Sequence, residues 1–303
     1  MPRPNMPLPF EGVPFNIPIA DVSFVKHKYL DIVYASSSPT QKLDIYLPSE
    51  GVGPFPIMFV IHGGGFEIGD KRDVTLLSFL EGIKYGFAVV SVNYRLSREA
   101  QFPAAVQDVK AAMRWVRAHH EEYSLDPERI AALGGSAGGN LAAILGTTGR
   151  TTGFDDPVLG NLEFSSEVHA VVDWFGPLDF LAMDEQHAQN GVDKQDHNRA
   201  DSPELKYLGA LITTVPELVK KANPVTYLHP GVPPFFIQHG NRDDLVPYQQ
   251  SQNLAEAIKR IAPGALAHFE LLDGAGHGDP LFETPENMAK VFAFLEKTLV
   301  KTR

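Results

Sequence analysis

The chain has 303 residues, of which 44% are apolar, and its 37 acidic and 26 basic side chains give it a net charge of −11. This acidity argues against a nucleic-acid partner, because phosphate binding needs an excess of lysine and arginine. The chain has no cysteine, which excludes disulfides and thiolate metal sites. No apolar run reaches the roughly 18 residues of a membrane span, so no membrane association is expected.

The first twenty residues are rich in proline and predict an extended arm on the surface. They lack the apolar stretch of a secretory signal, so we expect a cytoplasmic protein. Two strand-like segments follow, near residues 24–35 and at Lys42–Leu47. The second alternates apolar and polar side chains, and together they predict an antiparallel hairpin at the edge of a sheet.

After Pro56 the pattern changes to continuous apolar runs separated by helical stretches. The runs lie at Ile57–Ile61, Ala88–Val92, Ile130–Leu133, Val168–Phe175 and Phe235–Gln238, with a more mixed one at Ala267–Leu272. Helical periodicity occurs at Ala104–His120, Tyr248–Ile261 and Pro285–Leu299. This alternation indicates an α/β fold with a mostly parallel central sheet and helices on both faces. The length fits a single domain over residues 1–303.

A glycine-rich loop follows the first buried run. The sequence His62-Gly63-Gly64-Gly65-Phe66 lets the backbone approach a substrate without Cβ clashes. Attack on a carbonyl creates an oxyanion, which needs backbone N–H donors fixed in advance. We predict that Gly64 and Gly65 supply two of these donors, and that His62 fixes the loop by hydrogen bonds without taking part in proton transfer.

The strongest motif is G-x-S-x-G at Gly134–Gly138, between the run Ile130–Leu133 and the helical stretch Asn140–Leu145. A strand–turn–helix of this kind strains the serine backbone and exposes its hydroxyl above the sheet. Ser136 is therefore the predicted nucleophile, and Ala137, the residue after it, is the predicted third oxyanion donor.

The sequence also offers a base and an acid in the order that such a triad requires. His277 lies in Gly274-Ala275-Gly276-His277-Gly278, after the last strand-like run and before the last helix. Two adjacent aspartates, Asp243 and Asp244, follow the run Phe235–Gln238. Either of them could orient the imidazole of His277.

One segment interrupts the alternation of strands and helices. Residues 176–224 are polar, contain short helical pieces and follow the run Val168–Phe175. In an α/β sheet the functional loops lie at the carboxyl ends of the strands. We expect this insertion to be a small lid that sets substrate choice rather than chemistry. The alternative is a surface decoration that covers apolar sheet.

Taken together, these motifs resemble those of the carboxylesterases of the α/β-hydrolase superfamily, and most closely those of bacterial feruloyl-esterase-like enzymes. The resembling stretches include Val92–Leu96, Phe102–Ala112, Leu125–Ile130, Val171–Pro177 and Ala222–Pro224. The chain departs from hormone-sensitive-lipase-like esterases, which carry Asp before the nucleophile where this chain has Gly135. The resemblance implies the α/β-hydrolase fold, and its H-G-x-x-D-x-x-V-P motif favours Asp243 over Asp244.

The expected activity is hydrolysis of short-chain acyl or hydroxycinnamoyl esters, with a small ester or a feruloylated or acetylated oligosaccharide as substrate. Phe66, Trp174 and Leu245 follow their motifs closely and could line an acyl pocket, or simply pack the loops. Alternative functions are an arylformamidase-like amidase, an acetyl esterase for plant polysaccharide, and a non-catalytic receptor. The presence of Ser136, Asp243 and His277 argues against the receptor. No metal or cofactor is expected, and no oligomeric state is specified.

Overall fold

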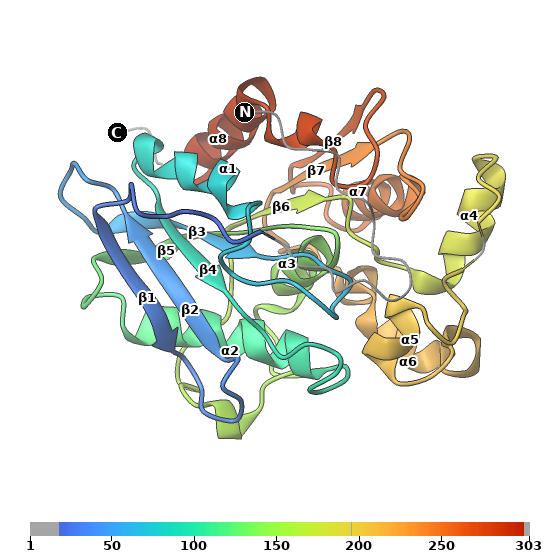
Figure 1. The fold of residues 1–303 in the computed structure, drawn as a ribbon, viewed down its shortest axis with the longest axis horizontal. Helices are drawn as coiled ribbons and strands as arrows, with labels where there is room; N and C mark the ends of the chain where they lie inside the picture. Colours follow the sequence, from blue (N-terminus) through green and yellow to red (C-terminus); the bar gives the residue numbers. More distant parts are fainter. Residues whose placement is uncertain (1–17, 195, 300–303) are drawn as a thin grey trace.

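The computed structural model describes residues 18–194 and 196–299. Within them, eight strands form one sheet in the order β1-β2-β4-β3-β5-β6-β7-β8 (Figure 1). The strands are β1 His27–Val33, β2 Lys42–Leu47, β3 Phe55–Ile61, β4 Ala88–Val92, β5 Leu125–Gly135, β6 Ala170–Trp174, β7 Phe235–Gly240 and β8 Ala267–Leu272. β1 and β2 pair antiparallel at one edge, β2 also runs antiparallel to β4, and the remaining pairs are parallel. The predicted edge hairpin and mostly parallel sheet are confirmed.

Helices cover both faces of this sheet. The longer ones are α2 Ala104–Ala118, α3 Ala137–Thr148, α7 Gln249–Ile261 and α8 Pro285–Leu299, and α1 Leu76–Leu80 is a single short turn. α2, α3 and α7 pack in one apolar cluster, whereas α1 and α8 pack in a second cluster on the opposite face. In Figure 1, α1 and α8 accordingly lie above the strands and α2 below them.

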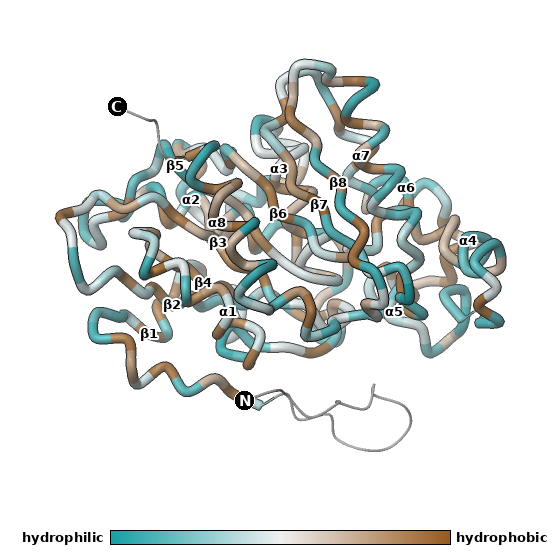
Figure 2. The backbone as a smooth tube through the Cα atoms, turned by 90° about the horizontal axis from the view of Figure 1, so that it is seen from above, coloured by the Kyte–Doolittle hydropathy of each residue, from teal (hydrophilic) through white to brown (hydrophobic). Residues whose placement is uncertain are grey.

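The core consists of the strands that the apolar runs predicted. Every residue of β4 and β6 is buried, as expected for strands that are covered on both sides. Figure 2 shows hydrophobic residues concentrated along the central strands, with hydrophilic colour on the outer turns. The face of α2 predicted to be apolar is buried as well, including Val109, Met113 and Val116.

The segment 176–224 lies beside the carboxyl ends of β6 and β7, at one end of the molecule (Figure 1). It contains α4 Met183–Gln189, α5 Pro203–Leu208 and α6 Pro216–Ala222. Elsewhere in the part of the chain that the structure describes, and within this segment, short 3-10 turns lie at Glu81–Tyr85, Pro157–Leu159, Phe180–Ala182, Ile212–Thr214, Pro224–Tyr227 and Pro280–Glu283. Despite the polar composition of the segment, Phe180, Met183, Tyr207 and Val219 are buried in the same apolar cluster as α2 and α3.

Candidate active site

The sharp turn between β5 and α3 carries Ser136. Its backbone has φ 56° and ψ −125°, a combination that is strained for a residue with a side chain. A Cβ on Gly138 would lie 2.1 Å from the carbonyl oxygen of Ile61, so only glycine fits there. The N–H of Ser136 donates to the carbonyl of Trp174 at 2.9 Å, which fixes the turn against β6.

His277 and Asp243 reach this turn from two other loops. The Nε2 atom of His277 lies 2.9 Å from Oγ of Ser136, and its Nδ1 atom lies 2.7 Å from Oδ2 of Asp243. The structure thus brings together three residues that are 107 and 34 positions apart in the chain. Because the carboxylate can only accept at Nδ1, Nε2 is left free to take a proton from the serine. Asp244, the other sequence candidate, is exposed.

Asp243 is held as a buried anion. Burial raises its pKa, but the neighbouring His277 and the hydrogen bonds of His239 and His277 outweigh this effect and hold the pKa far below its usual range. The backbone N–H groups of Leu245 and Val246 donate to Oδ1 at 2.9 and 2.8 Å. The acid therefore stays ionised wherever the protein is folded near neutral pH.

His239 is a buried neighbour of the acid that the sequence analysis did not single out. Its Nε2 atom lies 2.8 Å from the carbonyl of Val246 and 3.3 Å from Oδ2 of Asp243, and its Nδ1 atom lies 2.7 Å from Oγ of Ser251. Nε2 must carry the proton because the Val246 carbonyl only accepts. The sequence feature that could have identified His239 is its position in the H-G-x-x-D motif, directly before Gly240.

The glycine loop lies directly against the turn that carries Ser136. A Cβ on Gly63 would lie 2.9 Å from the carbonyl oxygen of Gly135 and 3.4 Å from Cβ of Ser136. Gly64 and Gly65 follow with φ of 103° and 59°, a region that favours glycine. Ala137 is the first residue of α3, so its N–H has no partner within the helix. The three predicted donors thus border one site.

The segment after β4 supports this loop from one side. The Tyr94 hydroxyl donates to the carbonyl of His62 at 3.0 Å, and the two rings stack with centroids 4.4 Å apart. Nδ1 of His62 lies 2.8 Å from the carbonyl of Gly63. The N–H of Ser97 donates to the carbonyl of Phe66 at 2.7 Å. These contacts give His62 a structural place in the loop, as expected for a residue that fixes the loop by hydrogen bonds.

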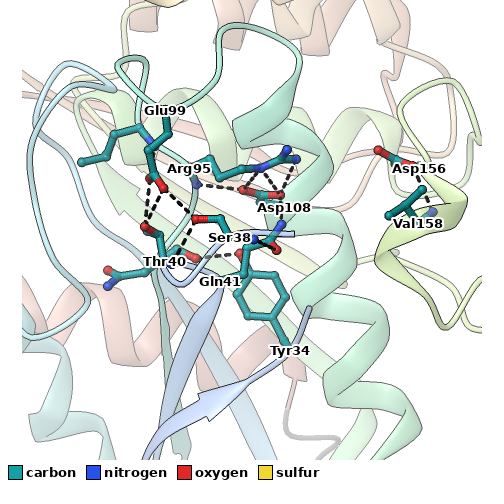
Figure 3. Close-up of polar contacts among 11 residues, drawn as sticks. Tyr34, Ser38, Thr40, Gln41, Arg95, Glu99, Asp108, Asp156 and Val158 are labelled. Atoms are coloured by element: carbon teal, nitrogen blue, oxygen red, sulfur yellow. Dashed lines mark hydrogen bonds and ion pairs between the residues drawn. The ribbon is translucent and has the colours of Figure 1, made fainter. Parts of the chain in front are cut away.

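That supporting segment is itself anchored by a buried carboxylate (Figure 3). Asp108 of α2 accepts from Nε and Nη2 of Arg95 at 2.9 and 2.8 Å, and from the Arg95 backbone N–H at 2.8 Å. Nε2 of Gln41 donates to the same carboxylate at 2.8 Å. One side chain therefore joins the edge hairpin, the segment after β4 and helix α2.

The three residues expected to line an acyl pocket lie in different surroundings. Phe66 is 2% exposed and packs against the insertion, and Leu245 is half-buried against the core. Trp174 is 3% exposed and packs between Phe79 and Phe282, with centroids 5.0 and 5.7 Å away. The structure therefore corrects the expectation for Trp174, because its strand directs the ring into the core.

The next residue, Phe175, is the aromatic side chain that contacts the site instead. Its φ is 43°, which turns the chain as it leaves β6. The ring lies edge-on to His277, with centroids 4.8 Å apart, and also contacts Phe282. Sequence alternation along the strand could not have revealed this, because the left-handed backbone at Phe175 breaks the alternation.

Within residues 18–194 and 196–299, no group of three or more His, Cys, Asp or Glu side chains is arranged to hold a metal ion. Among the helices of the same residues, none combines the length and apolar composition needed to cross a membrane.

The BD-FAE family matches residues 43–258. Two proteins of Mycobacterium tuberculosis, the probable carboxylic ester hydrolase LipM and the esterase LipQ, are 31% and 30% identical over 80% of the chain. The chain spans about half the length of these curated relatives, 54% and 55%.

Solved structures give the same result. A truncated carbohydrate esterase from gut microbiota is 31% identical with a TM-score of 0.84, and the match covers 94% of this chain and 100% of that one. A bifunctional GH43-CE protein of Bacteroides eggerthii is 32% identical with a TM-score of 0.80, over 89% of this chain and 38% of that one. The chain therefore belongs to the BD-FAE family and has the α/β-hydrolase fold.

Proposed function

We propose that the chain is a serine carboxylesterase, with Ser136 as nucleophile, His277 as general base and Asp243 as the acid that orients it. The observation that carries this proposal is the continuous line of contacts Asp243–His277–Ser136, at 2.7 and 2.9 Å, on a strained strand–turn–helix. The names of the relatives, an ester hydrolase and an esterase, also support it.

The chemistry would follow from this geometry. Oγ of Ser136 attacks the ester carbonyl while Nε2 of His277 takes its proton, and Asp243 stabilises the imidazolium that forms. The N–H groups of Gly64, Gly65 and Ala137 stabilise the oxyanion. The intermediate collapses as His277 returns the proton to the leaving alcohol, which leaves an acyl-Ser136. Water activated by His277 then releases the acid.

We infer that the substrate is a short-chain acyl or hydroxycinnamoyl ester, and that its alcohol is a sugar. Two structural relatives above 30% identity carry the words carbohydrate esterase or GH43-CE in their names. In this proposal the insertion 176–224 lies over the site as a lid and contacts the part of the substrate away from the scissile bond.

We predict that Ser136→Ala folds normally and loses ester hydrolysis by a factor on the order of 10⁴, because no other residue can form the acyl-enzyme. Hydrolysis of p-nitrophenyl acetate and circular dichroism would measure the two properties. Turnover near that of the wild type in the variant would overturn the assignment of Ser136.

A substrate panel would test the proposed substrate class separately. p-Nitrophenyl acetate, methyl ferulate, acetylated xylan and N-formylkynurenine would be compared by kcat/KM. We expect acetylated xylan or methyl ferulate to be hydrolysed, and N-formylkynurenine to be a poor substrate. Preference for N-formylkynurenine would instead support the arylformamidase alternative.

A further inference from the structure

The residue that follows the glycine loop has a strained backbone. Phe66 has φ 60°, a conformation that is rare for a bulky side chain and persists only where the surroundings enforce it. It comes directly after Gly65, one of the two proposed oxyanion donors in this loop. Whatever holds Phe66 therefore also determines where the N–H groups of Gly64 and Gly65 point.

The insertion supplies the surroundings that hold this ring. Tyr207 of α5 stacks on Phe66 with centroids 3.8 Å apart and planes 8° from parallel. Phe180, also from the insertion, contacts the Phe66 ring edge-on at 6.5 Å. All three rings are buried. The aromatic contact is thus closed to water.

Helix α5 contacts three consecutive residues of the loop. A Cβ on Gly65 would lie 3.1 Å from Cβ of Pro203, at the start of the helix. Nζ of Lys206 pairs with Oε2 of Glu67 at 2.8 Å. The carbonyl of Tyr207 accepts the N–H of Phe102 at 2.8 Å, which ties the helix to the main sheet domain. The helix is therefore a fixed support rather than a loose cover.

We propose that Tyr207 is a positioning residue for the oxyanion hole: its ring clamps the strained Phe66 and so fixes the N–H groups of Gly64 and Gly65. This inference rests on the proposed esterase function. The ring, not the hydroxyl, carries the role, because the Tyr207 hydroxyl has no hydrogen-bond partner among the residues that the structure describes. The insertion then contributes to the chemical step as well as to substrate choice.

The test compares three variants on p-nitrophenyl acetate. We expect Tyr207→Ala to lower kcat by about 10- to 100-fold, less than the roughly 10²–10³ of losing a whole donor, with KM changed by less than about threefold. Inhibition by phenylboronic acid, whose adduct places an oxygen in the oxyanion hole, should weaken in parallel. Tyr207→Phe, which keeps the ring and removes only the hydroxyl, should keep the kcat of the wild type. Phe294→Ala removes a buried ring of α8 that packs in the apolar cluster on the other face of the sheet and should leave kcat unchanged.

The outcomes separate this inference from the function on which it rests. If the wild type hydrolyses no ester, or Ser136→Ala stays active, the proposed function fails. If the wild type is active and Tyr207→Ala keeps kcat within about twofold, or Phe294→Ala loses as much, only the positioning role fails. If Tyr207→Ala does not fold, Tyr207→Leu replaces it, because leucine fills most of the space but has no ring to stack on Phe66. The same decrease in kcat and the same small change in KM are expected for it.

Discussion

Asp173 is a carboxyl group buried under the nucleophile helix with little to compensate its charge. Its Oδ1 accepts the N–H of Gly176 at 3.1 Å, whereas its Oδ2 has no partner among the described residues. Burial raises its pKa from 3.8 to about 7, against the lowering effect of the Gly176 hydrogen bond. In the folded protein the group is therefore protonated at mildly acidic pH, where the unfolded chain has already lost the proton.

This difference predicts how stability changes with pH. A raised folded-state pKa gives stability that is complete below about pH 4 and is lost as pH rises to about 7, by a few kcal/mol in total. Asp173→Asn removes the titration, so the variant should gain stability relative to the wild type across that range. Urea unfolding at one-unit pH steps would measure the difference in the free energy of unfolding between the variant and the wild type. Asp179→Asn, at an exposed position, is the control. A difference that is constant with pH would contradict the prediction.

Individual site residues differed in how far the sequence could predict them. Ser136 and His277 could be predicted because the glycines beside them permit the tight turns that such a site needs. The choice of Asp243 over its neighbour Asp244 rested on the H-G-x-x-D-x-x-V-P motif of the resembling family, and the structure places Asp243 against His277. Trp174 lies in the core with 3% of its surface exposed. The sequence could not show that Phe175 faces the site instead, because its left-handed backbone, with φ 43°, breaks the alternation of the strand.

At the scale of elements, the insertion is tied to the acid loop through His197. Its Nδ1 lies 2.6 Å from Oδ1 of Asp184, and its Nε2 lies 2.9 Å from the carbonyl of Leu245. Both partners are acceptors, so the ring must donate from both nitrogens and is charged. Burial lowers the pKa of His197, but the nearby Glu204 and Asp184 outweigh it and the pKa is raised.

We predict that His197→Ala changes substrate preference more than chemistry. Loss of the ring releases the insertion from Leu245 while α5 stays on the glycine loop. The ratio of kcat/KM for methyl ferulate to that for p-nitrophenyl acetate should change several-fold, and acetate hydrolysis should stay within about threefold. Arg199→Ala is the matched control, because this exposed side chain pairs only with Asp201 within the described residues. An unchanged ratio would argue against the lid.

The insertion was also the element that sequence predicted least well. Its polar composition indicated a loosely resting lid that leaves chemistry to other loops. Several of its apolar residues, Tyr207 and Phe180 among them, nevertheless become buried. The packing of Tyr207 on Phe66 changes that expectation, because shortening the whole segment would also remove a contact of the glycine loop that we propose forms the oxyanion hole. Contacts between segments 140 residues apart leave no local signal.

For the molecule as a whole, the apolar runs predicted the sheet well. β2, β4 and β8 begin and end where the pattern placed them, and α8 does as well. β5 is longer than its apolar run because Leu125 already pairs with Phe55. The short helix α1 was missed, since five residues are too few for helical periodicity to appear. The predicted arm at residues 1–17 lies outside the described residues.

Long-range hydrogen bonds and ion pairs also hold the elements together, and Asp108 connects three of them (Figure 3). Its carboxylate is fully buried and binds Gln41, 67 residues away in the chain, together with Arg95, whose side chain is 17% exposed. These bonds cross from the edge hairpin to the helix layer.

Asp108→Ala should therefore destabilise the entire molecule rather than one loop. Breaking a buried pair by removing one partner costs about 3–5 kcal/mol, and the partial exposure of Arg95 favours the lower end. Glu99→Ala, in the same neighbourhood but exposed, should cost less than about 1 kcal/mol. Thermal and urea unfolding would measure the stability of both variants. The double variant Arg95→Ala with Asp108→Ala should lose less stability than the sum of the two single losses.

If Asp108→Ala costs no more stability than Glu99→Ala, the carboxylate does not join these layers. If activity disappears well below the unfolding transition, its main effect is instead local, through Tyr94 on the glycine loop.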